Sequence, residues 1–157
     1  LMLRYFGAKI NVQDKTNTRR LITLLGQPEL EAKRIKIPGD PSSAAFPIVA
    51  ALITPNSKIT LKNVGINPLR IGLIETLLEM GGKIQVKNKR KEAGEAVGDL
   101  IVESSELKGV VIPPTRAPSM IDEYPILSIA AAKAKGTTLD KLMEPMMLPK
   151  CFIPNPS

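Results

Sequence analysis

The chain has no histidine and no tryptophan, and it has one cysteine, Cys151, among its 157 residues. A single cysteine cannot form a disulfide within the chain. Without histidine, this chain alone cannot build a Ser-His-Asp or Cys-His catalytic group, and the usual zinc ligand sets are excluded for the same reason. Any acid–base chemistry that it performs must therefore use Asp, Glu, Lys, Tyr or water.

Long apolar segments and aromatic side chains are also scarce. No apolar run reaches the roughly 20 residues that cross a bilayer, and the sequence does not open on a charged-then-apolar leader with a small-residue cleavage site. These absences predict a cytoplasmic protein without membrane contact. Because there are only three Phe and two Tyr at 43% hydrophobic content, the core is predicted to be mainly aliphatic.

Acidic residues are fewer than basic ones, since 15 Asp and Glu against 22 Lys and Arg give a net charge of +7. Such a surface suits a small anion such as a phosphate or a carboxylate, or a nucleic acid. A solvated basic surface with no ligand explains the same charge. Charge alone leaves these interpretations open.

What the chain does contain is an internal repeat. Residues 3–12, LRYFGAKINV, align without gaps with residues 77–86, LLEMGGKIQV, and Gly7 falls on Gly81. Both segments read as a helix end, a glycine stop and a strand, and each leads through a polar stretch into a second strand. The repeat of about 75 residues is longer than the usual solenoid periods.

A second pair of segments supports the repeat. Residues 45–52, AFPIVAAL, resemble residues 123–130, EYPILSIA. Each segment reads as a short apolar helix with a proline in its first turn, where the missing N–H costs little. The repeating unit is therefore predicted to be helix, strand, helix and hairpin, in an α/β (α+β) fold with helices packed against sheets.

The first candidate site is residues 37–52, IPGDPSSAAFPIVAAL. We expect a strand to end at Gly39, with Asp40, Ser42 and Ser43 in front of an apolar helix. Free N–H groups at a helix start attract anions, but Asp and Ser are also preferred N-caps. Capping is the favoured interpretation. The GxxxxGK[ST] and GxGxxG spacings are absent.

The second candidate site is residues 119–132, SMIDEYPILSIAAA, where Asp122 and Glu123 stand directly before an apolar helix. Asp122 fits an N-cap, and Glu123 fits the positive end of the helix. An acid with cationic neighbours also stays ionised and can accept a proton from a substrate hydroxyl. Helix rules by themselves favour capping for both acids.

Three long stretches carry a family resemblance: IKIPGDPSSAAFPIVAALI (35–53), NPLRIGLIETLLEMGGKIQV (67–86) and RAPSMIDEYPILSIAAAKAKGTT (116–138). In this order they resemble 5-enolpyruvylshikimate-3-phosphate synthase, also called 3-phosphoshikimate 1-carboxyvinyltransferase, and most closely its bacterial, glyphosate-tolerant class. The resemblance covers the chain from its first residue to about Thr138. It implies two domains, each of three βαβαββ units, with the active site in the cleft between them.

The resemblance also implies a domain division. Residues 1–36 would end one enolpyruvyl transferase domain, and residues 37–138 would begin the repeat units of the other. Residues 139–157, LDKLMEPMMLPKCFIPNPS, diverge from the family and are predicted to be an irregular tail. The two-domain structure of this chain would then be incomplete.

The implied reaction moves the enolpyruvyl group of phosphoenolpyruvate to the 5-hydroxyl of shikimate 3-phosphate, in the biosynthesis of aromatic amino acids. It uses no metal and no organic cofactor. Both substrates are anions, which gives the basic balance a reason, and members of the family are typically monomers without nucleic-acid or membrane partners. Asp122 aligns with the aspartate that binds the shikimate ring hydroxyls and accepts a proton, whereas Glu123 has no comparable role and stays a helix-start charge.

The chain departs from the family pattern after Thr138, where a RVKESDR-type motif with a catalytic Glu is expected. The family's N-terminal Lys, Ser and Arg, its Ser-Ala-Gln phosphate loop and its C-terminal arginines also have no match. The sequence therefore resembles a central fragment of the enzyme, and we predict that it is inactive alone.

Three alternatives stay open at this stage. A related transferase that acts on UDP-N-acetylglucosamine shares the repeat fold, although its catalytic cysteine loop is not seen. A basic nucleic-acid-binding module is permitted by charge, but aromatic stacking residues are scarce. A remnant that no longer folds stably is the third.

Overall fold

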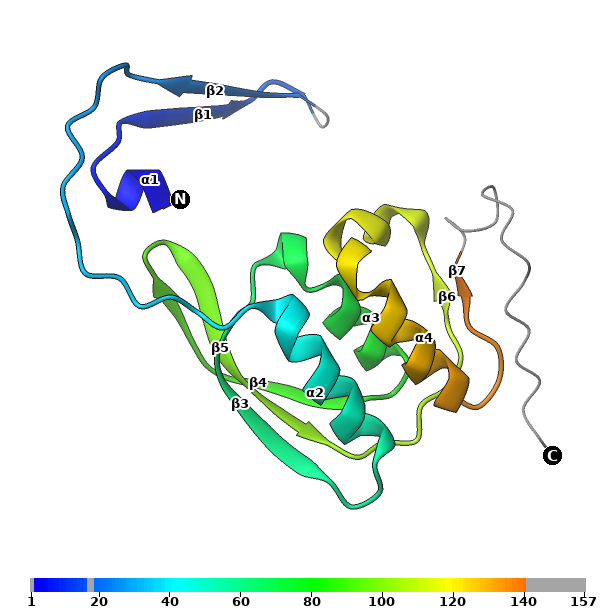
Figure 1. Cartoon of the computed structure of the whole chain (residues 1–157). Helices are drawn as coiled ribbons and strands as arrows, with labels where there is room; N and C mark the ends of the chain where they lie inside the picture. The colour runs from blue at the N-terminus through cyan, green and yellow to red at the C-terminus, as the bar shows by residue number, and fades with distance from the viewer. Residues whose placement is uncertain (1, 17–18, 141–157) are drawn as a thin grey trace.

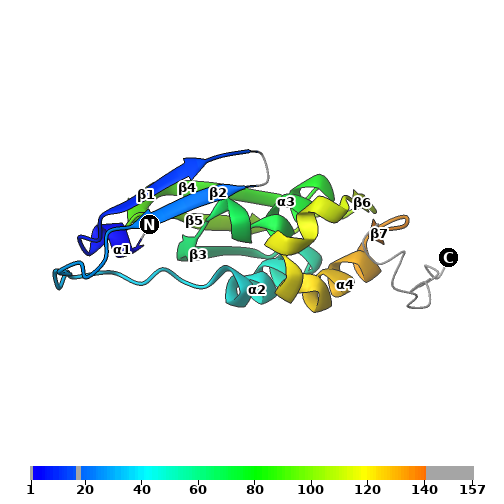
Figure 2. The same cartoon turned by 90° about the horizontal axis from the view of Figure 1, so that it is seen from above.

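The computed structural model describes residues 2–16 and 19–140, which form two units joined by an extended linker (Figure 1). The larger unit is a three-stranded antiparallel sheet in the order β3-β5-β4, from β3 (Lys58–Gly65), β4 (Lys83–Glu92) and β5 (Glu95–Glu103). Helices α2 (Pro41–Ile53) and α3 (Gly72–Glu79) lie against one face of this sheet, and Figure 2 shows α4 (Tyr124–Lys133) side by side with α2. This is the mixed helix and sheet fold that the sequence predicts.

The helices of the larger unit are separated by short 3-10 turns. The α-helices are α2 (Pro41–Ile53), α3 (Gly72–Glu79) and α4 (Tyr124–Lys133). The 3-10 turns are η1 (Pro68–Arg70), η2 (Pro114–Ser119) and η3 (Ile121–Glu123). No helix among residues 2–16 and 19–140 is long and apolar enough to cross a membrane.

The N-terminal unit confirms the predicted helix followed by a hairpin. Helix α1 (Met2–Tyr5) precedes the antiparallel strands β1 (Ile10–Asp14) and β2 (Arg20–Leu24). The pairing begins at Ile10 with Leu24 and ends at Asp14 with Arg20.

Matching backbone turns confirm the repeat between the two units. The chain turns out of its helix at Gly7 with φ 103° and at Gly81 with φ 90°, a backbone region that favours glycine. The next amide reaches back to the same helical carbonyl in each copy, from Ala8 N to Leu3 O at 2.9 Å and from Gly82 N to Leu77 O at 2.8 Å. Conserved turn geometry, and not only similar letters, therefore relates the two segments.

The second pair of helices is less alike than the sequence predicts. Pro125 lies in the first turn of α4, as expected, but Pro47 lies inside α2, which already begins at Pro41. Helix α2 starts earlier because Asp40 caps it and Pro41 supplies a preset first residue. Before α4, Met120 has φ −150° and ψ 26°, which is not helical, so 3-10 turns replace those first helical turns.

The linker enters the sheet at Gly39 without forming the predicted strand. Residues 31–38 have no regular structure, and Gly39 makes only an isolated parallel bridge with Val64. Gly39 N donates to Asn63 O at 2.7 Å, and Gly65 N donates to Gly39 O at 2.9 Å. The strand prediction was wrong here, because Pro38 has no N–H with which to extend a ladder.

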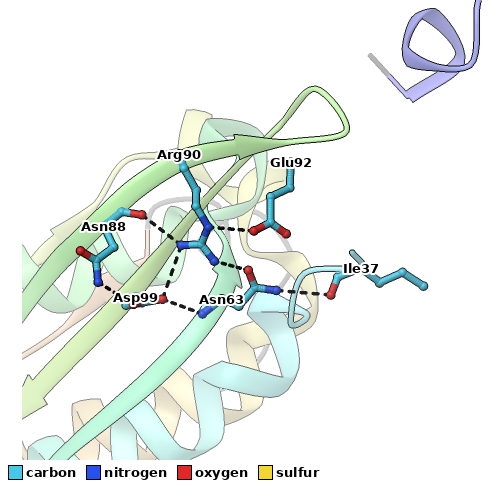
Figure 3. A network of polar contacts seen from close by, with 6 residues as sticks. All are labelled: Ile37, Asn63, Asn88, Arg90, Glu92 and Asp99. Atoms are coloured by element: carbon cyan, nitrogen blue, oxygen red, sulfur yellow. Dashed lines mark hydrogen bonds and ion pairs between the residues drawn. The ribbon is translucent and has the colours of Figure 1, made fainter. Parts of the chain in front are cut away.

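A polar network holds the end of this linker (Figure 3). The ladders on both sides of β5 carry an irregularity, and each holds an asparagine with positive φ, Asn63 at 59° and Asn88 at 49°. The Asp99 carboxylate accepts from Asn88 Nδ2 and from Asn63 N, each at 2.8 Å, and these bonds with nearby Arg90 lower its pKa. Asn63 Nδ2 in turn donates to Ile37 O at 3.4 Å, which ties the linker to the sheet.

The core lies between the helices and the sheet and is aliphatic, as predicted. Its largest fully buried side chains include Ile48, Leu52, Leu77, Met80 and Leu100. These residues come from α2, α3 and β5 and from the turn after α3, and they form one cluster. Burying such side chains is the main favourable contribution to folding.

The last described strand corrects part of the tail prediction. Strand β7 (Leu139–Asp140) pairs in parallel with β6 (Val111–Ile112), so these two residues are not irregular. Residues 141–157, which include Cys151, lie outside the described residues.

Candidate functional site

The two candidate stretches of the sequence meet in the fold. The start of α2 contacts η3, which leads directly into α4. The Ser42 hydroxyl donates a hydrogen bond to Glu123 Oε1 across 81 positions of sequence. The starts of both repeat helices therefore form one surface region (Figure 1).

At the start of α2, Asp40 is an N-cap, as the favoured interpretation has it. Its Oδ2 accepts from Ser43 N and from Ser43 Oγ, each at 2.9 Å. The hydrogen bond from the Ser43 amide is the main reason why the pKa of Asp40 is lowered, and the Ser43 hydroxyl and Arg70 add to it. A carboxylate at this position opposes the binding of a second anion to the same N–H groups.

Arg70 is a cation at this site that sequence reasoning did not select. It ends η1, and its Nη2 donates to Ser42 Oγ at 3.0 Å and to Asp40 Oδ1 at 3.2 Å. Half of the side chain is exposed, at 51%. The guanidinium therefore combines contact with the site and access for an anionic ligand. The sequence signal that could have identified Arg70 is its position in the NPLR segment (67–70), within one of the stretches that resemble the family.

The three polar residues of the DEY sequence, residues 122–124, differ in burial and in hydrogen-bond partners. Asp122 is exposed in η3. Glu123 is buried, with 6% exposure, and accepts from Ser42. Tyr124 is half-buried, and burial together with the nearby Asp140 carboxylate raises the pKa of its hydroxyl. Asp122 is therefore the most exposed of the three residues.

Neither acid caps α4, so the capping expectation was wrong for both. Glu123 occupies the N-cap position but makes no side-chain capping bond, and Asp122 lies one residue earlier in the 3-10 turn. Glu123 does stand at the start of α4, as expected, and its carboxylate accepts a hydrogen bond from Ser42 at the start of α2. A buried carboxylate needs such a partner, since desolvation penalises its charge.

The segment before Asp122 is fastened to α3 by Arg116 of η2. Arg116 Nη1 and Nη2 bind Glu79 Oε2 and Oε1 at 2.6 and 2.5 Å, and Nη1 also donates to Thr76 Oγ1 at 3.2 Å. A bidentate guanidinium–carboxylate pair fixes orientation as well as distance. This pair therefore helps to set where η2, and η3 behind it, lie on the helices.

No group of three or more Asp, Glu or Cys side chains in the described ranges is arranged to hold a metal ion. The polar side chains of the site are instead hydroxyls, carboxylates and a guanidinium. These groups are suited to binding a polar ligand and to accepting a proton.

The sequence profile described as EPSP synthase (3-phosphoshikimate 1-carboxyvinyltransferase) matches residues 1–141. The chain belongs to this family. It is 59% identical over 138 residues to the 3-phosphoshikimate 1-carboxyvinyltransferase of Granulibacter bethesdensis, covering 87% of the chain and 30% of that protein. The enzyme of the same name from Paramagnetospirillum magneticum is also 59% identical over 138 residues, with 88% and 31% covered.

A solved EPSP synthase from Acinetobacter baumannii has the same fold as this chain. The TM-score is 0.80 at 43% sequence identity, and the match covers 88% of the chain and 30% of that structure. The chain thus spans about 30% of the length of the relatives that it matches. The resemblance to the shikimate enzyme is confirmed, and these relatives carry its name and not that of the UDP-sugar transferase. The domain division and the role of Asp122 stay predictions.

The Arg116–Glu79 pair gives this family member a predicted acid sensitivity. The hydrogen bonds from Arg116 lower the pKa of Glu79 below its ordinary 4.5. A depressed folded pKa stabilises the fold at pH values above 4.5, and this stabilisation is lost as pH falls through the folded value. Because Glu79 is 48% exposed, solvent screens the pair, and we expect Glu79→Gln to cost at most about 1 kcal/mol at neutral pH.

Urea unfolding of the wild type and of Glu79→Gln across a pH series measures this effect. The difference in the free energy of unfolding between the wild type and Glu79→Gln should shrink as the pH falls below 4.5, the ordinary pKa of a glutamate. Glu29→Gln, at an exposed position of the linker, is the matched control and should show little difference at any pH. A difference for Glu79→Gln that is independent of pH would contradict the assignment.

Proposed function

We propose that this chain carries the part of an enolpyruvyl transfer site that binds the shikimate ring, with Asp122 as ring-hydroxyl ligand and proton acceptor. The observation that carries the proposal is the exposure of Asp122 at the junction of two repeat helices in a chain of this family. The substrates would be shikimate 3-phosphate and phosphoenolpyruvate. We also infer a cytoplasmic location, because the family's reaction belongs to amino acid biosynthesis, and a monomeric parent enzyme.

The chemistry assigned to Asp122 is that of a general base. The 5-hydroxyl oxygen forms a bond to the enolpyruvyl carbon and loses its proton, which an ionised carboxylate within hydrogen-bond reach accepts. The bond between that carbon and the phosphate oxygen breaks, and phosphate leaves. An ionised carboxylate accepts hydrogen bonds only, so it suits ring hydroxyls that donate. Arg70, exposed in the same surface region, favours the approach of anions.

A chimera tests whether this segment serves that reaction. Residues 1–138 of the chain replace the matching segment of the Granulibacter bethesdensis relative, which is 59% identical over 138 residues. Phosphate release with both substrates is then measured against the unmodified relative. We expect turnover within about tenfold of the relative. A chimera that folds with the relative's thermal stability but releases no phosphate would overturn the proposal.

The isolated chain is predicted to release no phosphate above background with both substrates present. Electrostatic stabilisation of developing charge is usually the largest catalytic contribution. The cationic segments that the family resemblance implies for this stabilisation have no match in these 157 residues. Turnover approaching that of the full-length relative, in the same assay, would contradict this prediction.

A further inference from the structure

Glu123 is the one charged residue that is buried in the described part of the chain, at 6% exposure. A buried carboxylate is costly unless it is hydrogen-bonded or paired. Ser42 supplies the hydrogen bond, and Arg70 Nη2 donates to the same Ser42 oxygen at 3.0 Å. A hydrogen-bonded series thus runs from an exposed guanidinium through a hydroxyl to a buried carboxylate.

This series joins segments that are distant in sequence. Arg70 belongs to η1, Ser42 to the first turn of α2, and Glu123 to the last position of η3. Arg70 also binds Asp40, the N-cap of α2, at 3.2 Å. The start of α2 is therefore the fixed element on which both η1 and η3 are held.

Asp122 lies between two buried anchors of the short η3 turn. On one side, Met120 is 1% exposed, and its sulfur accepts from Thr76 Oγ1 at 3.6 Å. On the other side, the Glu123 carboxylate is held by Ser42. The Glu123 amide closes the turn by donating to Met120 O at 3.0 Å. With both ends fixed, the backbone of Asp122 has little freedom to move.

We infer that Glu123 and Ser42 form a positioning pair that fixes the place of Asp122 relative to α2. The inference rests on the proposed function, because it takes Asp122 to be the group that touches substrate. Glu123 itself touches no substrate, since it is buried and points to Ser42. Losing the pair would let η3 shift, and a displacement of about 1 Å at a reacting group can cost 10²-fold in rate.

The first measurement uses the full chain and does not depend on catalysis. Amide hydrogen exchange is compared in the wild type, Glu123→Gln, Glu123→Ala and Ser42→Ala. We expect the backbone amide of residue 123 to exchange faster in the variants than in the wild type. The increase should be largest in the two alanine variants and smallest in Glu123→Gln, which keeps an acceptor oxygen. The amide of Val102 in β5 reports whether the sheet is intact. Unchanged exchange in η3 with an intact sheet would overturn the inference.

The second measurement uses the chimera and asks whether Glu123 acts through Asp122. Glu123→Ala should lower kcat about 10- to 100-fold, with partial rescue by Glu123→Gln. In an Asp122→Asn background, the same change should cost little more, because the group that it positions is already lost. Ser42→Ala should follow the same pattern if Glu123→Ala fails to fold. Glu29→Gln, an exposed control, should leave kcat unchanged.

The outcomes separate this inference from the proposed function. If Asp122→Asn alone leaves turnover unchanged, the proposed function fails, and the positioning role fails with it. If Asp122→Asn lowers turnover but Glu123→Ala lowers it equally in both backgrounds, Glu123 has only a structural role and the inference alone is overturned. A loss confined to the Asp122 background supports both.

Discussion

Replacing Asp122 by asparagine in the chimera is expected to lower kcat by about 10²- to 10⁴-fold, the usual contribution of a positioned general base. Asparagine keeps the size of the side chain and one acceptor oxygen, but it cannot take up a proton. The KM for shikimate 3-phosphate should change less than kcat, because the amide oxygen still accepts from a ring hydroxyl. Steady-state phosphate release with each substrate varied in turn measures both quantities.

Stability should not explain this loss. Asp122 is exposed and makes no capping bond, so its replacement should change the free energy of unfolding by no more than about 0.5 kcal/mol. The matched control is Asp14→Asn, an exposed acid in β1 whose ion pair with Arg20 is also exposed. If the Asp122→Asn variant turns over as fast as the Asp14→Asn control, Asp122 has no catalytic role.

The repeat is the part of the fold that the sequence predicts best, and the reason is local. Gly7 and Gly81 mark the same left-handed turn out of a helix, and few other residues adopt that backbone readily. The strand that follows each turn alternates in a way that any reader of the sequence can detect. A backbone conformation that only a few residue types adopt can therefore be predicted from the sequence.

Two predictions of secondary structure were wrong because they considered one residue pattern without the neighbouring residues. Pro47 fits a first helical turn, yet Asp40 and Pro41 begin α2 earlier, and the helix runs through Pro47. A strand was expected to end at Gly39, but Pro38 cannot donate to a ladder, and only one bridge forms. In both places, a stronger neighbouring signal decided the structure.

The site shows what helix rules alone cannot distinguish. Asp122 and Glu123 are adjacent acids before an apolar helix, and helix rules favour capping for both, although the family resemblance selects Asp122. The difference arises from Ser42, which comes from another repeat unit and selects Glu123 as its acceptor. Arg70 was missed because its contacts with Ser42 and Asp40 exist only once η1 packs against the start of α2.

Replacing Leu77 by alanine is expected to lower the free energy of unfolding by about 2–5 kcal/mol, the largest stability change that we predict. Leu77 of α3 is 0% exposed and belongs to the core cluster between the helices and the sheet. The loss combines the transfer of the side chain from water with the cavity that it leaves. Since domains are stable by only about 5–15 kcal/mol, this one change removes a large share of the total.

Leu78→Ala is the matched control for Leu77→Ala, because it makes the same substitution at the next position of α3. Leu78 is 44% exposed, so helix propensity changes equally in both variants while core packing changes only in Leu77→Ala. Urea unfolding followed by circular dichroism should show a large fall in the midpoint for Leu77→Ala at an unchanged slope, and a small one for Leu78→Ala. Equal losses would mean that α3 is not packed on the sheet as described. The turns that hold Asp122 would then lose their support as well, because Arg116 and Met120 are fastened to that helix.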